Sequence, residues 1–178
     1  MRLRAFALAV FAVIGVRSAK ADAMRLYSYD PANAETRAAA GPLTFEFRQG
    51  LFRTTMISLR ATEAQATAYL TPTNDKDAAA YGLKTLIASS FARDLYEVRG
   101  DQDGAALIAA FCPGATRAWM AFGRPHLDQG LRVLVLGPAA GGAKVCRTLD
   151  FTFHGAWRAP PRDKIPPRPT RESPFSRF

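Results

Sequence analysis

The alternation of apolar and polar residues in the second half of the chain is the feature that most limits how this sequence can fold. Leu149, Phe151 and Phe153 alternate with polar residues within residues 145–154. Because side chains of a strand point to opposite faces in turn, this pattern predicts a strand with one buried face. The wider region, residues 95–157, reads as a strand, a helix and three strands, and it is the best-specified part of the fold.

The first half of the chain shows a similar succession of elements. Residues 43–48 and 53–60 alternate on either side of Gln49-Gly50 and predict an antiparallel hairpin, with a further strand at residues 65–70. Helix-favouring residues precede and follow this group. We therefore expect an α+β fold, mostly antiparallel β-sheet with two or three helices. Two similar β-α-β-β-β halves are an alternative that the sequence leaves open.

The first 23 residues have the three-part pattern of a secretory signal peptide. Arg2 and Arg4 precede an uncharged apolar run at residues 5–16, and small residues in Ala-x-Ala spacing follow it. The pattern predicts export to the periplasm or the medium, with removal of residues 1–23. The alternative is that Met24 is the true start of the protein.

The rest of the chain suits one domain and a tail. Residues 24–157 are long enough for a single core, and they contain no apolar run of the ~20 residues that a transmembrane helix needs. We therefore expect no transmembrane span in the mature chain. From residue 158 the chain is rich in proline and arginine, a composition that favours extended or disordered structure.

The basic charge lies mainly outside the expected domain. Of the net charge of +9, the first 23 residues carry +3 and residues 158–178 carry +4, which leaves +2 for residues 24–157. This distribution, together with export, argues against nucleic acid as a partner. It favours an acidic partner for the tail. The candidate binding residues in the tail are Arg158, Arg162, Lys164, Arg168 and Arg171.

Two cysteines in an exported chain most simply form a disulfide, and we expect one between Cys112 and Cys146. Two reduced thiols are the alternative if the chain is not exported. Cys146 falls among the polar residues of its strand, whereas Cys112 lies beside the apolar face of its helix. A bond between them predicts either a bulge between Cys146 and Leu149 or a helix end at the edge of the sheet.

Motifs for catalysis, metals or cofactors are weak. His154 and Asp150 share a strand face but lie ~13 Å apart along it, too far for a direct relay. His126 lies in a turn near Asp128. The aspartates at 101 and 103 resemble the start of a calcium loop, but its twelfth position is Cys112 rather than glutamate. We expect no metal site and no cofactor.

These observations predict a non-enzymatic, exported binding or scaffold protein of a bacterial-type cell envelope. Its partner would be a protein or an anionic envelope polymer, engaged in part through the tail. The alternative is a periplasmic hydrolase that uses His154 or His126 with a nearby aspartate.

Overall fold

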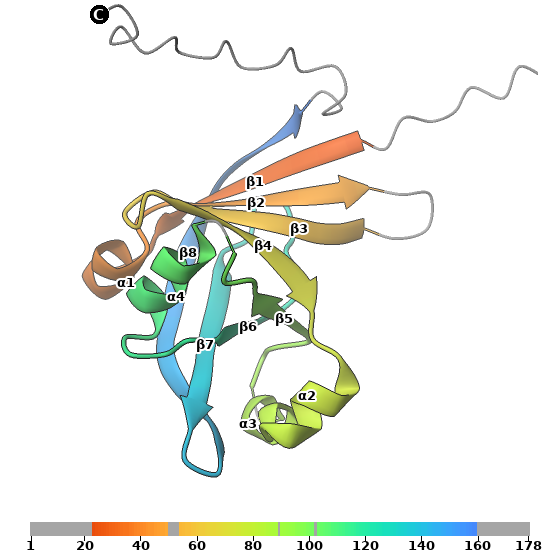
Figure 1. Cartoon of the computed structure of the whole chain (residues 1–178). Coiled ribbons are helices and arrows are strands. Elements are labelled where there is room, and N and C mark those ends of the chain that lie inside the picture. The colour runs from red at the N-terminus through yellow and green to blue at the C-terminus, as the bar shows by residue number, and fades with distance from the viewer. Residues whose placement is uncertain (1–22, 50–53, 89, 102, 160–178) are drawn as a thin grey trace, which may run out of the picture.

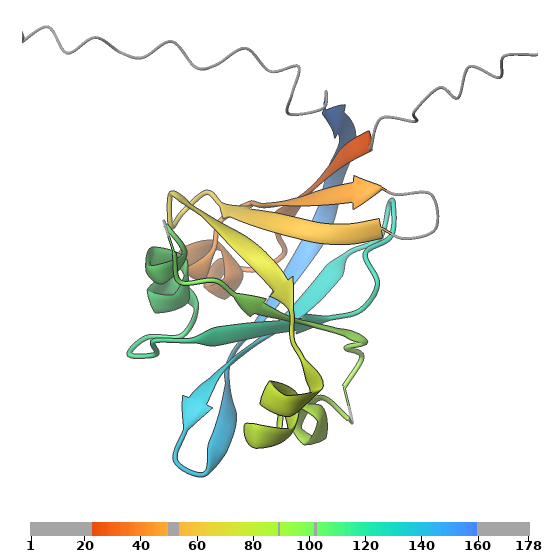
Figure 2. The ribbon, with the colours of Figure 1, turned by 45° about the vertical axis from the view of Figure 1, so that its right-hand side comes forward.

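A closed antiparallel β-barrel organises the chain in the computed structural model, which describes residues 23–49, 54–88, 90–101 and 103–159 (Figures 1 and 2). Each strand pairs with the next one along the chain, and β8 pairs back with β1. The elements are β1 (Ala23–Pro31), α1 (Ala34–Ala39), β2 (Leu43–Gln49), β3 (Thr54–Ala61), β4 (Ala66–Pro72), α2 (Asp75–Ala80), α3 (Leu83–Ile87), β5 (Asp94–Val98), α4 (Gly104–Phe111), β6 (Ala118–Phe122), β7 (Leu131–Ala139) and β8 (Gly142–Ala159).

The expected α+β fold is wrong, because the eight strands close into one barrel and the helices are short connections between them. Closure depends on the ladder between β1 and β8, which pairs Met24 with Ala159 and Pro31 with Phe151. Local alternation indicates that each segment is a strand, but it carries no information about pairing between such distant segments.

The order of elements repeats along the chain within this barrel. A strand, a helix and three strands occur first as β1-α1-β2-β3-β4 and again as β5-α4-β6-β7-β8, and α2 and α3 connect the two series. The two series are halves of one closed sheet, since β4 pairs with β5 and β8 with β1.

The barrel interior is filled by the apolar side chains on the inward face of the strands. Leu43, Phe45 and Phe47 of β2 are buried, as are Ala66, Ala68 and Leu70 of β4. The inward residues of β4 are mostly small and those of β2 are large, which suits the limited width of an eight-stranded barrel.

One end of the barrel is closed by helices, and we call it the closed end. Figures 1 and 2 show α1 and α4 side by side there. Leu107, Ile108 and Phe111 of α4 are buried in the same cluster as the inward side chains of the strands. Gly104 begins this helix so close to Arg99 that a Cβ would overlap the Arg99 carbonyl oxygen. The same Cβ would lie 3.5 Å from the Cβ of Ala68, so the start of the helix packs directly against β4.

The cysteine pair ties the closed end to the sheet. Cys112 follows α4, and its sulfur lies at disulfide distance from that of Cys146 in β8, with the Cα atoms 5.2 Å apart. A Cβ on Gly137 of β7 would overlap both sulfur atoms, so only glycine fits beneath the bond.

A β-bulge at Cys146 explains how this residue reaches the interior. Leu136 pairs with Val145 while Val135 pairs with Arg147, so Cys146 is the extra residue of β8. The prediction of a bulged strand is confirmed, although the bulge lies at Cys146 itself rather than between it and Leu149. The extra residue resets the alternation and lets a cysteine of the polar set point inward.

Helices α2 and α3 cover the outer surface of the second half of the barrel. Trp119, Leu134 and Leu136 lie in a second buried cluster with Ala78 of α2 and Leu83 of α3. Arg117 holds this layer in place through its side chain, which binds Glu97 at 2.7 Å and Asp77 at 3.3 Å and lies over the rings of Tyr81 and Trp119.

Residues 1–22 of the predicted signal peptide and most of the tail fall outside the described residues, which begin at Ala23, the first residue of β1, and end at Ala159. Strand β8 includes Arg158, which the sequence assigns to the tail. Among the described residues, no helix is long and apolar enough to cross a membrane.

Candidate functional site

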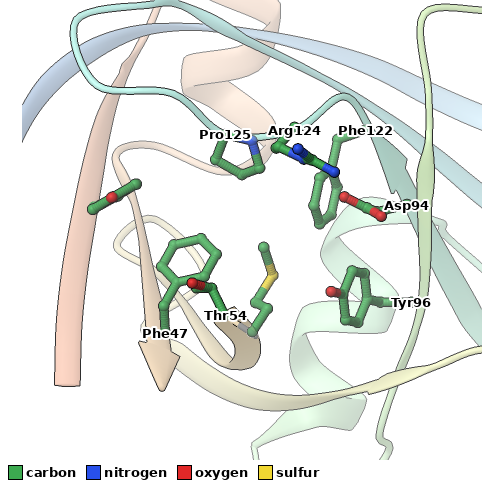
Figure 3. Close-up of a pocket in the computed structure, with 9 residues that line it drawn as sticks. Phe47, Thr54, Asp94, Tyr96, Phe122, Arg124 and Pro125 are labelled. Atoms are coloured by element: carbon green, nitrogen blue, oxygen red, sulfur yellow. The ribbon is translucent and has the colours of Figure 1, made fainter. Parts of the chain in front are cut away.

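The end of the barrel opposite α4, which we call the mouth, contains a cavity of about 530 Å³ (Figure 3). An eight-stranded barrel is just wide enough to hold side chains or one small ligand, and a cavity of this volume is in the range of ligand pockets. The cavity is lined by Tyr27, Phe47, Thr54, Met56, Asp94, Tyr96, Phe122, Arg124 and Pro125.

Two pairs of aromatic rings form much of the cavity wall. Tyr27 of β1 packs on Phe47 with ring centroids 4.9 Å apart, and Tyr96 of β5 stacks on Phe122 at 5.5 Å with nearly parallel rings. Figure 3 shows Phe47 and Tyr96 on opposite sides of the cavity. These flat rings offer apolar faces on both sides of a bound molecule.

The two pairs occupy equivalent positions in the two halves of the barrel. Tyr27 is in register with Phe45 and contacts the ring two residues further along β2. Tyr96 is in register with Met120 and contacts the ring two residues further along β6. The repeated order of elements therefore supplies both walls of the cavity.

Charged side chains are concentrated around the mouth. Asp94 begins β5 and Arg124 follows β6, and both line the cavity. Arg25 of β1 lies on the same strand face as Tyr27, two residues nearer the mouth end of the strand, and is directly opposite Arg158 of β8. Like charges opposite each other on neighbouring strands repel. The buried Nε of Arg25 also has no hydrogen-bond partner among the described residues. The arginines of the mouth are therefore suited to an anionic group, beside the carboxylate of Asp94.

Tyr29 lies deeper in the barrel than Tyr27 and is fully buried between Phe45 and Phe153. Its hydroxyl has no hydrogen-bond partner in the described part of the chain. Burial, with a smaller effect from Tyr27, raises the pKa of Tyr29 to about 12, because the phenolate would lose its hydration. Tyr29 therefore belongs to the buried interior rather than to the lining of the mouth cavity.

A smaller hollow lies on the outer face of the first half of the barrel. It has a volume of about 290 Å³ and is lined by Leu26, Thr44, Glu46, Ser58, Arg60, Thr67 and Tyr69. Its polar groups bind one another: Ser58 donates to Glu46 at 2.6 Å, and Arg60 donates to Thr67 at 3.3 Å. The hollow is therefore a part of the outer sheet surface whose polar side chains hydrogen-bond to one another.

Neither histidine is among the described residues that line the mouth cavity, although His126 directly follows Pro125, which does. His154 Nδ1 lies 2.7 Å from Asp30 of β1, and the two side chains are 54% and 49% exposed. Asp150, the expected partner, instead binds Arg132. His126 and Asp128 are both exposed in the segment between β6 and β7. The structure thus forms a histidine–aspartate pair, but not with the aspartates named from the sequence.

The predicted binding residues of the tail are only partly described. Arg158 lies at the mouth end of β8, and Arg162, Lys164, Arg168 and Arg171 fall outside the described residues. The lining residues of the mouth were not predicted as a site. The signal that could have indicated them is the Leu-Tyr pair that begins a strand in each half, at residues 26–27 and 95–96.

Comparisons of the chain with models of protein families, with curated proteins and with solved structures found no significant match.

Proposed function

We propose that this is a non-enzymatic binding protein whose mouth cavity holds the acidic, amphipathic part of a partner. The observation that carries the proposal is a cavity of about 530 Å³ with aromatic walls and Arg124 in its lining. Aromatic side chains with a few convergent polar groups are typical of ligand sites. Arg124 can donate paired hydrogen bonds to a carboxylate or phosphate.

The rim of the mouth supports an anionic partner as well. Arg25 and Arg158 face each other on neighbouring strands beside the cavity, and Arg158 begins the sequence segment 158–178, which has a net charge of +4. A negatively charged protein segment or envelope polymer would be attracted to this surface and would relieve the repulsion between the two arginines. Export to the periplasm, based on residues 1–23, is part of the same proposal.

The proposal is tested with 8-anilinonaphthalene-1-sulfonate, a probe with aromatic rings and one anionic group. We expect saturable binding to the folded protein, read from the rise in fluorescence. Substituting Arg124→Gln should weaken binding about 10-fold, the usual effect of losing a hydrogen bond to a charged group.

The matched control is Arg60→Gln, which removes an exposed arginine from the outer face rather than the mouth. It should leave probe binding unchanged. Equal weakening by both substitutions, or the absence of saturable binding, would contradict the proposal.

The hydrolase alternative rests on the pair of His154 and Asp30, which are 2.7 Å apart. An aspartate can orient a histidine that acts as a general base. The pair lies on an open surface, and among the described residues no hydroxyl or thiol side chain hydrogen-bonds to His154. Hydrolysis of p-nitrophenyl acetate that disappears with His154→Asn and persists with His126→Asn would favour this alternative over binding alone.

A further inference from the structure

Asp94 and Arg124 are neighbouring charges that line the mouth cavity and form no ion pair within the described part of the chain. Asp94 is in register with Phe122, and the adjacent backbone is fixed by a 3.0 Å hydrogen bond from Arg93 N to the Phe122 carbonyl oxygen. Arg124 follows two residues later. Figure 3 shows both side chains at the same side of the cavity, next to the ring of Phe122.

These two charges differ from three arginines of the second half whose charges are already paired. Arg99, Arg117 and Arg132 each form an ion pair with a carboxylate. Among the described residues, Asp94 and Arg124 form no ion pair within 4.0 Å, with each other or with another side chain. A carboxylate and a guanidinium are thus both directed to a shared cavity and are both available to a bound molecule.

The surface beneath the charges is apolar. Met56, Phe47 and Phe122 are buried lining residues, and Tyr96 lies parallel to Phe122. A molecule that makes favourable contacts with all of these groups therefore needs a positive group for Asp94, a negative group for Arg124 and an apolar or aromatic body for the rings.

We infer that the mouth binds a zwitterion of the α-amino acid type, with its ammonium group at Asp94, its carboxylate at Arg124 and an aromatic or large apolar side chain between the rings. A free amino acid and a short peptide share this chemistry. The inference rests on the proposed function, because it names the class of ligand for the same cavity.

The test is calorimetric titration of the whole protein with L-phenylalanine, N-acetyl-L-phenylalanine and L-phenylalaninamide. Blocking the ammonium group or the carboxylate should each weaken binding about 10-fold or more, since each removes a hydrogen bond between charged groups. With Asp94→Asn, phenylalanine and its acetyl derivative should bind equally. With Arg124→Gln, phenylalanine and its amide should bind equally.

The dipeptide Phe-Phe distinguishes the two sources of the ligand. Stronger binding of phenylalanine assigns the site to a free amino acid, and stronger binding of the dipeptide assigns it to a short peptide. Thermal unfolding followed by circular dichroism verifies that both variants are folded.

The inference is overturned if the blocked derivatives bind the wild-type protein as well as phenylalanine does, or if none of these molecules binds. Saturable binding of the naphthalene sulfonate probe, weakened by Arg124→Gln, would in that case leave the proposed function standing. Failure of the probe as well would remove both.

Discussion

The two ends of the barrel are built from the same strands but differ in what fills them. At the closed end, α4 places Leu107, Ile108 and Phe111 among the inward side chains, and the Cys112–Cys146 pair joins it to β8. At the mouth, the corresponding space is a cavity bordered by Asp94 and Arg124, which form no ion pair with other described residues. A helix with an apolar face decides which end becomes core and which end stays open to a ligand.

This difference separates stability from binding. Apolar burial and a covalent cross-link stabilise the closed end, and both act whether or not a ligand is present. The charges of Asp94 and Arg124 contribute little to the fold, because among the described residues they form no ion pair that unfolding would break. Changes at the closed end should therefore alter unfolding, and changes of charge at the mouth should alter binding.

Removing the Phe111 side chain should have the largest effect on stability. Phe111 is fully buried in α4, so Phe111→Ala leaves a cavity in the closed end and should lower the free energy of unfolding by about 3–5 kcal/mol. Urea unfolding followed by tryptophan fluorescence measures the change.

The control for this prediction lies on the mouth side of the barrel. Leu127, between β6 and β7, is 51% exposed, so Leu127→Ala should change the unfolding free energy by about 0.5 kcal/mol or less. Similar losses from both substitutions would show that α4 does not close the barrel as described.

Breaking the cysteine pair should have the next largest effect. The bond closes a loop over a sequence separation of 34 residues, for which chain entropy predicts about 3–4 kcal/mol of stabilisation. Dithiothreitol should lower the unfolding temperature of the wild-type protein by the corresponding amount. The double variant Cys112→Ala/Cys146→Ala should not respond to the reductant, and a wild-type protein that is equally insensitive would contradict the bond.

Raising the pH should destabilise the protein through Tyr29. Its pKa is about 12 in the folded protein against 10.0 for an exposed tyrosine. Between these values the unfolded chain loses the proton and the folded protein keeps it, so stability is retained below pH 10 and falls as the pH rises toward 12. The loss at pH 11 is about 1.4 kcal/mol.

Urea unfolding at pH 9 and pH 11 measures this effect, and Tyr29→Phe is the matched variant because it keeps the ring and removes the hydroxyl. The variant should lose about 1.4 kcal/mol less than the wild type over this pH range. An equal pH dependence in the two proteins would show that the Tyr29 hydroxyl is reached by water from the mouth.

The smallest effect on stability is expected from the charges of the mouth. Asp94→Asn and Arg124→Gln leave the apolar packing intact and break no ion pair of the described residues, so each should change the unfolding free energy by about 0.5 kcal/mol or less. A loss of several kcal/mol in thermal or urea unfolding would place these residues in the structural core rather than at a binding site.

Sequence patterns predicted the local features well. The alternation of Leu149, Phe151 and Phe153 locates β8, and the position of Cys146 out of phase with it indicated a bulge that the structure contains. Both inferences depend on residues close together in the chain. The mouth was missed because its lining comes from five separate strands and one loop, which only the closed barrel brings together.

The sequence by itself determined where strands form, which faces they bury and which two cysteines are available to pair, since alternation and composition are local properties of the chain. Only the tertiary structure decided that β1 pairs with β8, that α4 fills one end of the barrel, and that Asp94 and Arg124 share a cavity at the other. The physical reason is that these contacts join segments far apart in sequence, and their free energy depends on the complete barrel.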